Sequence, residues 1–503
     1  MSREALLQAH ALVSQGRVDD ALAITTPLAE AAEPSALAFA VHTRALKAAH
    51  RLDEALEWDE RAVALHPNVG ALWHNYGATL GDLGRGPASI EALGRAFALG
   101  LDAAESWGVL ARARLACGDA DGAEAAFREA LRRAPRDEGT ANQLADLLWM
   151  RDGDLDAAQA VLDESFQRGG HPAPLVLAKA KLYEAAGQGP TAANLLALAT
   201  ERIPGDVAIL LAAAQAALEN DRLDLADAFA AAAQRLAPDA PGVLNQLVIL
   251  RLAQGRAEEA LGIAKSALST HPADQSLWGW AAVAARAIGD PLYRELYDYD
   301  SMVRPFEIDT PAGWPSLAAF LSDLAATLDR LHVFEHHPSA QSLRNGSQTL
   351  TLLTGVDAPP LRAFFGEVDK CVRAYMAALG PGSDPLRRRN VGDYRIEGAW
   401  SVRLKPGGFH RDHFHPQGWL SSAFYVDTPD SALASDERQG WIRFGQPPFK
   451  TIPPLPAEHY VRPQPGRLVL FPSYMWHGTV PFTTEERRLT IAFDVVPKAP
   501  RGV

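Results

Sequence analysis

Apolar and polar positions alternate with a helical period from the start of the chain, where the first residues already form an amphipathic pattern. Over the first 290 residues, regularly spaced turns interrupt this pattern, and a small residue follows each turn. These small residues stand 34 residues apart, with one step of 35, at Ala21, Ala55, Ser89, Ala123, Ala158, Ala192, Ala226 and Ala260. A series of prolines follows the same period at the expected helix ends, at Pro67, Pro135, Pro204, Pro238 and Pro272. We therefore predict about eight antiparallel helix pairs.

A period of 34 residues with a turn, a small residue at the helix contact and a closing proline resembles the tetratricopeptide repeat. The aromatic and glycine positions of segment 71–77 also resemble the first helix of that repeat. The resemblance implies an all-α tetratricopeptide superhelix over residues 1–290, with a concave groove that binds a protein or peptide. A spacer or an assembly arm is the alternative role for such an array.

The alanine-rich period stops at Asp290, and we expect residues 291–315 to form a capping helix and a linker. In the remaining domain, residues 316–503, apolar positions predict helices at 317–331 and 360–379. The segment between them, 341–349, is too polar for a core. His332, His336 and His337 have no pattern of partners, so we expect them at the surface.

After Gly398 the pattern changes to short alternating runs that are separated by proline and glycine turns. No helical period intervenes, which indicates an antiparallel sandwich or jelly roll flanked by the two helices. The predicted strands are 400–404, 420–426, 441–444, 467–471 and 488–495.

Charge and cysteine content limit the partners and the cellular compartment that we expect for this protein. A net charge of −13 argues against nucleic-acid partners, because phosphate binding needs a positive surface. The two cysteines, Cys117 and Cys371, are far apart, which excludes a disulfide framework and favours a reducing compartment. We find neither a signal peptide nor an apolar run that could span a bilayer, so we expect a cytoplasmic protein without a membrane partner.

Potential metal ligands crowd the turn that follows the first predicted strand. His413 and His415 are two residues apart and point to the same side of an extended segment. His410 and Asp412 form a second such pair that faces the other way. Either pair, together with His477 after a later strand, gives three ligands on one face of an ion and leaves positions open, as in non-haem iron sites.

An arginine follows the last of these histidines on the next predicted strand. Arg488 is placed to bind a carboxylate through two hydrogen bonds, and Thr490 lies on the same strand face. Fe(II), a co-substrate carboxylate and an arginine clamp are the requirements of 2-oxoglutarate chemistry.

These features together resemble bacterial tetratricopeptide-repeat proteins that end in a 2-oxoglutarate/Fe(II) oxygenase domain. The resemblance begins near Tyr299 and extends to the C-terminus. It is carried by segments 341–349, 400–404, 408–410, 413–416, 418–422, 471–473, 477–482 and 488–494.

The resemblance implies a double-stranded β-helix, Fe(II) as cofactor and 2-oxoglutarate as co-substrate. It places the metal ligands at His413, His415 and His477, with Arg488 on the far carboxylate of 2-oxoglutarate and Tyr425 near the same pocket. The wider superfamily uses a His-x-Asp motif, which occurs in this chain at His410 and Asp412. That pair is the alternative set of ligands. A third reading keeps only His413 and His477 with water. No further catalytic residue can be assigned.

The sequence as a whole favours a dioxygenase that hydroxylates a protein or peptide recruited by the repeats. The layout also resembles aspartyl/asparaginyl β-hydroxylases at the level of the fold, although their metal motif differs. A repeat-based binding scaffold with a non-catalytic oxygenase-like domain is the alternative, and a small-molecule oxygenase is a further one.

Overall fold

The computed structural model describes residues 2–434 and 436–498, which form two compact units. The first unit contains the chain up to Leu144 together with Leu350–Val356, and the second contains Ala145–Thr349 and the chain from Asp357 onward. The division therefore runs through the helical array, within one helix, rather than at its end.

The first unit consists of four antiparallel helix pairs and the start of a ninth helix. Small residues at the helix crossings are fully buried, as in the repeat pattern: the hydroxyl of Ser89 donates to the carbonyl of Gly77 at 2.6 Å across one such crossing. Its elements are α1 (Ser2–Ser14), α2 (Val18–Ala29), α3 (Ala36–Ala48), α4 (Leu52–Leu65), α5 (Gly70–Asp82), α6 (Gly86–Ala98), α7 (Ala104–Ala116), α8 (Ala120–Arg133) and the short helix η1 (Leu353–Gly355), with α9 (Glu138–Asp152) crossing into the second unit.

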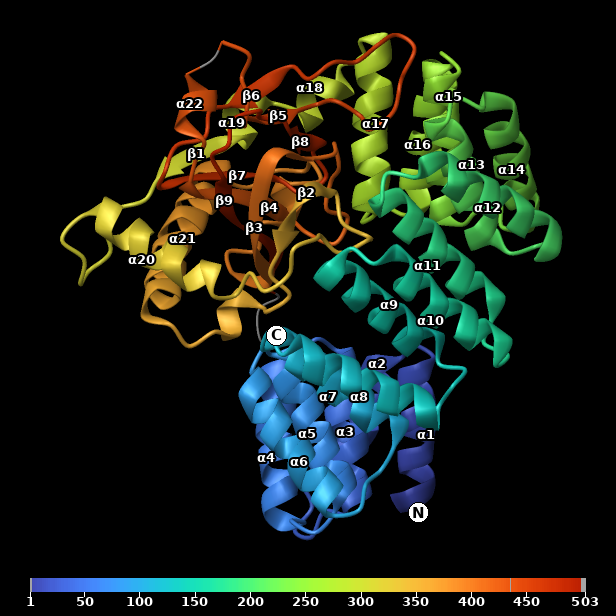
Figure 1. Ribbon diagram of the computed structural model, residues 1–503, viewed down its shortest axis with the longest axis vertical. Helices are drawn as coiled ribbons and strands as arrows, with labels where there is room; N and C mark the ends of the chain where they lie inside the picture. Colours follow the sequence, from blue (N-terminus) through green and yellow to red (C-terminus); the bar gives the residue numbers. More distant parts are fainter. Residues whose placement is uncertain (1, 435, 499–503) are drawn as a thin grey trace. The chain divides into compact units, whose positions relative to one another are not determined.

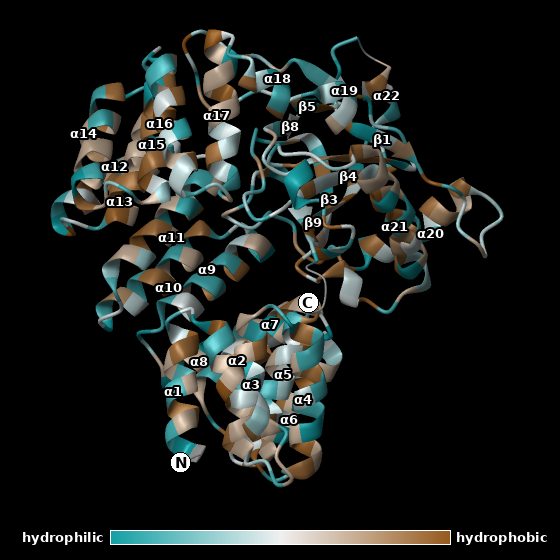
Figure 2. Ribbon diagram, turned by 180° about the vertical axis from the view of Figure 1, so that it is seen from behind, coloured by the Kyte–Doolittle hydropathy of each residue, from teal (hydrophilic) through white to brown (hydrophobic). Residues whose placement is uncertain are grey.

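The second unit continues the array with further pairs and one unpaired helix. Aspartates cap the N-termini of α10, α13 and α17 by accepting backbone N–H groups, and Gly289 ends α17 in the left-handed conformation. Figure 2 shows both hydrophobic and hydrophilic residues along the helices, as expected of amphipathic elements. The elements are α10 (Leu155–Gln167), α11 (Pro172–Ala185), α12 (Gly189–Arg202), α13 (Val207–Glu219), α14 (Leu223–Leu236), α15 (Pro241–Ala253), α16 (Ala257–Thr270) and α17 (Gln275–Ile288).

Helices also flank the sheets of the second unit, and two of them match the helices predicted from apolar positions. Phe364 of α21 (Pro359–Leu379) packs against Phe424 of β4 (Leu420–Asp427), with ring centroids 4.7 Å apart, so α21 lies against the larger sheet. No helix within residues 2–434 and 436–498 is long and apolar enough to cross a membrane. The helices are α18 (Leu292–Leu296), α19 (Tyr299–Met302), α20 (Leu317–Asp329), α21 (Pro359–Leu379), η2 (Arg387–Arg389) and α22 (Asp430–Leu433).

Two antiparallel sheets complete the second unit, as expected for a jelly-roll domain (Figure 1). The six-stranded sheet has the order β1-β7-β4-β9-β3-β2, and the three-stranded sheet has the order β6-β5-β8. A bridge between His413 and His477 connects the turn after β3 to β8. The strands are β1 (Arg304–Glu307), β2 (Leu343–Gln348), β3 (Tyr394–His410), β4 (Leu420–Asp427), β5 (Ile442–Phe444), β6 (His459–Val461), β7 (Arg467–Pro472), β8 (His477–Thr479) and β9 (Arg488–Pro497).

The structure corrects two expectations about polar segments. The segment 341–349 contains strand β2, in which Leu343 and Ser347 are fully buried. His332 and His337 are also buried rather than at the surface, and His336 is partly buried. His332 lies between the hydroxyls of Ser347 and Ser401, each 3.0 Å from one ring nitrogen, so hydrogen bonds compensate the burial of these polar groups.

Candidate metal centre

The structure brings three histidines together from two segments of the jelly roll. His413 and His415 lie in the turn after β3, and His477 begins β8. His413 and His477 exchange two backbone hydrogen bonds of 2.9 Å, and the N–H of His415 donates to the carbonyl of Ser473 at 2.8 Å. One ring nitrogen from each histidine lies within 4.8 Å of the other two. This spacing suits a single ion bound by all three.

Each of the three rings is oriented by a hydrogen bond at Nδ1. His413 Nδ1 lies 2.8 Å from the carbonyl of Arg411, and His477 Nδ1 lies 3.0 Å from that of Met475. His415 Nδ1 lies 2.7 and 2.8 Å from the two carboxylate oxygens of Asp494. Because these oxygens accept, each Nδ1 carries the proton, and each Nε2 keeps a lone pair for a metal.

The protonation of the three rings follows from their surroundings. Burial and the neighbouring His415 lower the pKa of His413 to about 3. Burial also lowers the pKa of His477 well below its ordinary value. Burial alone lowers the pKa of His415, but the charge of Asp494 and its hydrogen bond raise it above the ordinary value. His413 and His477 are therefore neutral near pH 7, the state in which imidazole binds a metal.

Asp412, a member of the alternative ligand pair, faces away from this cluster. Arg443 donates to both of its carboxylate oxygens, at 2.9 and 2.6 Å, and the amide of Gln446 donates at 3.2 Å. His410 lines the cavity, where its Nδ1 lies 3.1 Å from the hydroxyl of Ser342. The two members of this pair therefore have separate partners. Among the described residues, the group of three that could hold a metal is His413, His415 and His477.

A cavity of about 440 Å³ opens beside the three histidines. Arg488, Thr490, Ala492 and Asp494 line it from alternate positions of β9, because residues two apart face the same side of a strand. Arg488 is 2% exposed, and burial lowers the pKa of its guanidinium while the adjacent Tyr425 opposes that shift. Its Nε has no hydrogen-bond partner within the described residues.

Tyr425 occupies a different place from the other predicted pocket residues. Its ring centroid lies 5.0 Å from the guanidinium carbon of Arg488, and it does not line the cavity. Thr490 does line the cavity, and its hydroxyl donates to the carbonyl of Val402 at 3.4 Å. Tyr425 therefore contacts Arg488 without lining the cavity, whereas Arg488 and Thr490 line it.

Sequence reasoning missed two residues that orient this site. Asp494 holds His415, and the hydroxyl of Ser421 on β4 donates to Asp494 at 2.7 Å. The signal for Asp494 was present, because the alternation that pairs Arg488 with Thr490 continues to position 494 on the same face of the strand. Ser421 lies on another strand, and its contact depends on the pairing of β4 with β9.

The residues of the site suit both groups that the sequence implied. Three imidazole rings on one side of a cavity, two of them neutral near pH 7, are suitable ligands for a divalent transition metal. The buried cation of Arg488, whose Nε has no hydrogen-bond partner among the residues that the structure describes, is a suitable partner for a carboxylate in the same cavity. Together, the helical array and the histidine-lined jelly roll define a repeat protein with an oxygenase-type domain.

Comparisons with known families agree with this class. Residues 398–494 match the family model described as "Putative 2OG-Fe(II) oxygenase", and residues 77–138 match the model described as "Tetratricopeptide repeat". The chain therefore combines tetratricopeptide repeats with a C-terminal domain that is similar to the 2OG-Fe(II) oxygenase family over residues 398–494. A search among curated proteins found no match.

Similar solved structures include three at low sequence identity. One, the APC/C hetero-tetramer Cut9-Hcn1, has 15% identity and a TM-score of 0.34, with 49% of this chain and 48% of that chain covered. Another, pilF of Pseudomonas aeruginosa, has 20% identity and a TM-score of 0.34, with 41% and 94% covered. A tetratricopeptide repeat protein from Parabacteroides merdae has 14% identity and a TM-score of 0.35, with 50% and 98% covered.

Proposed function

We propose that this protein is an Fe(II)- and 2-oxoglutarate-dependent dioxygenase whose metal ligands are His413, His415 and His477. The observation that carries the proposal is the shared orientation of these rings. Each Nδ1 is engaged by an oxygen, and one ring nitrogen of each lies within 4.8 Å of the others beside a cavity that holds a buried arginine. Fe(II), 2-oxoglutarate and O₂ would together supply the oxidation of a C–H bond while 2-oxoglutarate loses CO₂ to become succinate.

In this proposal Arg488 binds the far carboxylate of 2-oxoglutarate. Its guanidinium is buried, so a carboxylate that pairs with it gains an interaction little screened by water. Thr490 presents its side chain to the same cavity and contributes a hydroxyl contact. The pairing also balances charge, because three neutral ligands leave the site positive and 2-oxoglutarate is a dianion.

The remaining cavity wall restricts water and leaves room for a second substrate. Trp400 stacks on His415, with centroids 6.0 Å apart, and Val402 and Ile442 add apolar surface. Gln341 and Gln348 line the same cavity and offer amide groups to a polar substrate. We propose that a protein or peptide, recruited by the repeats, presents the side chain that is hydroxylated.

The direct test is turnover of 2-oxoglutarate to succinate by the full-length protein with and without Fe(II), under air. The proposal expects iron-dependent succinate formation, and it expects Arg488→Ala to abolish turnover while iron binding persists. Arg467→Ala is a matched control, since Arg467 begins β7 of the same sheet and pairs with Glu307 outside the cavity. If the wild-type protein binds iron but forms no succinate, the protein is a repeat-based binding scaffold and the proposed enzymatic function is wrong.

A further inference from the structure

The loop 474–476 is the part of the connection between β7 and β8 that directly precedes His477. Its middle residue, Met475, provides the carbonyl that accepts the Nδ1 proton of His477 at 3.0 Å. The position of this carbonyl therefore sets both the tautomer of His477 and the direction of its Nε2. The groups that hydrogen-bond to the loop 474–476 therefore determine the orientation of the His477 ring.

One buried hydroxyl holds both neighbours of Met475. The backbone N–H of Trp476 donates to the Tyr297 oxygen at 2.8 Å, and the Tyr297 hydroxyl lies 3.4 Å from the carbonyl of Tyr474, to which it donates. Tyr297 is 1% exposed. It belongs to the segment between α18 and α19, which follows the repeats and lies outside both sheets.

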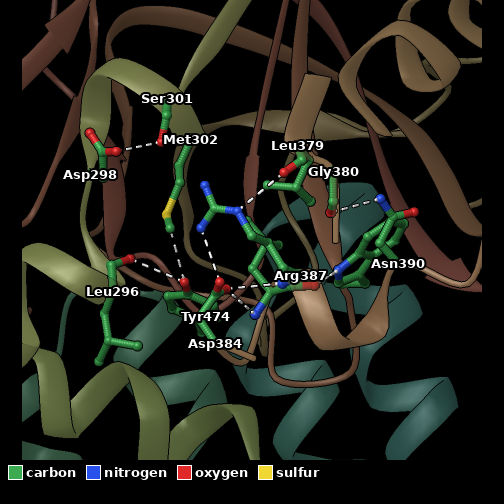
Figure 3. A network of polar contacts seen from close by, with 12 residues as sticks. Leu296, Asp298, Ser301, Met302, Leu379, Gly380, Asp384, Arg387, Asn390 and Tyr474 are labelled. Carbon is green, nitrogen blue, oxygen red and sulfur yellow. Dashed lines mark hydrogen bonds and ion pairs between the residues drawn. The ribbon is translucent and has the colours of Figure 1, made fainter. Parts of the chain in front are cut away.

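The same segment anchors the side chain of Tyr474. The Tyr474 hydroxyl donates to the carbonyl of Leu296 at 3.1 Å and lies 3.9 Å from the sulfur of Met302, as Figure 3 shows. The loop 474–476 is thus hydrogen-bonded to Tyr297 through its backbone, and to Leu296 through the side chain of Tyr474.

The last helix of the array also packs against this loop. The Trp280 ring of α17 lies 4.5 Å from that of Trp476 and 6.2 Å from that of Phe414, the residue between His413 and His415. A Cβ at Gly279 would lie 2.9 Å from the carbonyl of Tyr474, so glycine permits this close approach. One helix therefore contacts residues adjacent to all three histidines.

We propose that Tyr297 and Trp280 are positioning residues for the metal centre, so that the end of the repeat array is a structural part of the metal site. This inference rests on the proposed function. Without the Tyr297 hydroxyl, the N–H of Trp476 loses a buried acceptor and the carbonyl of Met475 is no longer fixed. The His477 ring then samples orientations that do not bind the ion.

The test compares Tyr297→Phe with Tyr293→Phe in the full-length protein, using Co²⁺ as the probe. Tyr293 is a matched control, because its buried hydroxyl contacts Tyr299 and Glu458 but not the loop 474–476. We expect Tyr297→Phe to weaken Co²⁺ affinity about tenfold, the lower end of the loss for groups that orient a metal ligand. The Co²⁺ absorption spectrum of this variant should also change, whereas Tyr293→Phe should keep the wild-type affinity and spectrum.

A second pair of variants tests the helix contact. Trp280→Ala should weaken Co²⁺ binding and Trp280→Phe should restore most of it. Trp278→Ala on the same helix should leave binding unchanged, since Trp278 lies under Arg388 and bonds the carbonyl of Pro272. Wild-type affinity in both Tyr297→Phe and Trp280→Ala, even with a lowered melting temperature, overturns this inference and leaves the proposed function intact. Absence of Co²⁺ binding in the wild-type protein overturns the metal site and this inference together.

Discussion

The three histidines differ in the oxygen that orients each ring. His413 and His477 donate to backbone carbonyls, whereas His415 donates to the carboxylate of Asp494. A carboxylate partner increases the electron density of the imidazole and so strengthens its bond to a metal. With no carboxylate among the three proposed ligands, Asp494 supplies the nearby negative charge through His415.

Replacing Asp494 with asparagine isolates the contribution of this charge. Asp494→Asn keeps an oxygen that accepts the His415 proton, so we expect about a tenfold loss of metal affinity rather than loss of the site. Asp427→Asn is the control, because Asp427 pairs with Arg487 away from the histidines. Titration calorimetry with Co²⁺ measures both variants, and equal affinities for wild type and Asp494→Asn would remove the role of the carboxylate.

His332 links pH to stability at the level of a single residue. Burial, with Arg403 nearby, lowers its pKa from 6.5 to about 4 in the folded protein. Between these pH values the unfolded chain binds the proton and the folded chain does not, so stability is lost as the pH falls from about 6.5 towards 4. At pH 5 the loss from this group is on the order of 2 kcal/mol.

Urea unfolding at pH 7 and pH 5 measures this contribution. His332→Gln should show a smaller loss of unfolding free energy between the two pH values than the wild-type protein, although it is less stable at pH 7. His336→Gln, a change at a partly exposed neighbour, serves as the control. The assignment is wrong if the wild-type protein and His332→Gln lose the same free energy.

Elements with a periodic pattern of apolar residues could be predicted from the sequence, whereas the polar strand β2 could not. The 34-residue period located the helix pairs, and alternation in 400–404 and 488–495 located parts of β3 and β9. Strand β2 escaped prediction because Ser347 is buried through its bond to His332, and such compensation between distant residues leaves no periodic signal. The strands β1, β6 and β8 were missed because three or four residues hold little alternation, although β5, which is equally short, was predicted within 441–444.

Helix α9 holds the segment that leads to the rim of the cavity. Asp146 accepts the backbone N–H of Ser339 at 2.9 Å, and the Trp149 indole donates to the carbonyl of His337 at 2.9 Å. Ala340, Gln341 and Ser342, which follow directly, line the cavity. This helix therefore fixes one edge of the proposed co-substrate pocket.

We expect Asp146→Ala to loosen this edge. Hydrogen exchange should become faster in residues 336–342, because the N–H of Ser339 loses its partly buried acceptor. Asp206→Ala is the control, since it removes a helix cap from α13 and costs about 1 kcal/mol without touching the rim. Equal exchange of residues 336–342 in the two variants would contradict the role of α9.

In the whole molecule, the later repeats belong to the same compact unit as the jelly roll. Arg286 of α17 pairs with Glu458 at 3.1 Å, and Arg411 beside the metal turn pairs with Glu219 of α13 at 3.1 Å. The sequence could not indicate these contacts, because single charged residues on amphipathic helices resemble any solvent-exposed residue. The domain boundary near residue 290 stays a prediction from composition.

Ligand binding should therefore stabilise the later repeats together with the sheets. Co²⁺ with 2-oxoglutarate at about 100 times the dissociation constant adds roughly 2.7 kcal/mol to the stability of the unit that binds them. We expect slower hydrogen exchange in α17 and in the strands, and little change in α1 to α6. Protection confined to the strands would show that the repeats fold independently of the site.

The most direct test of the central claim is the iron content of ligand variants after anaerobic dialysis against Fe(II). The account predicts that His415→Ala loses iron and that Asp412→Asn, which keeps an acceptor for Arg443, retains about one iron per chain, as expected of a single three-ligand site. Retention of iron by His415→Ala with loss by Asp412→Asn would contradict it and would assign the site to the alternative pair, His410 and Asp412.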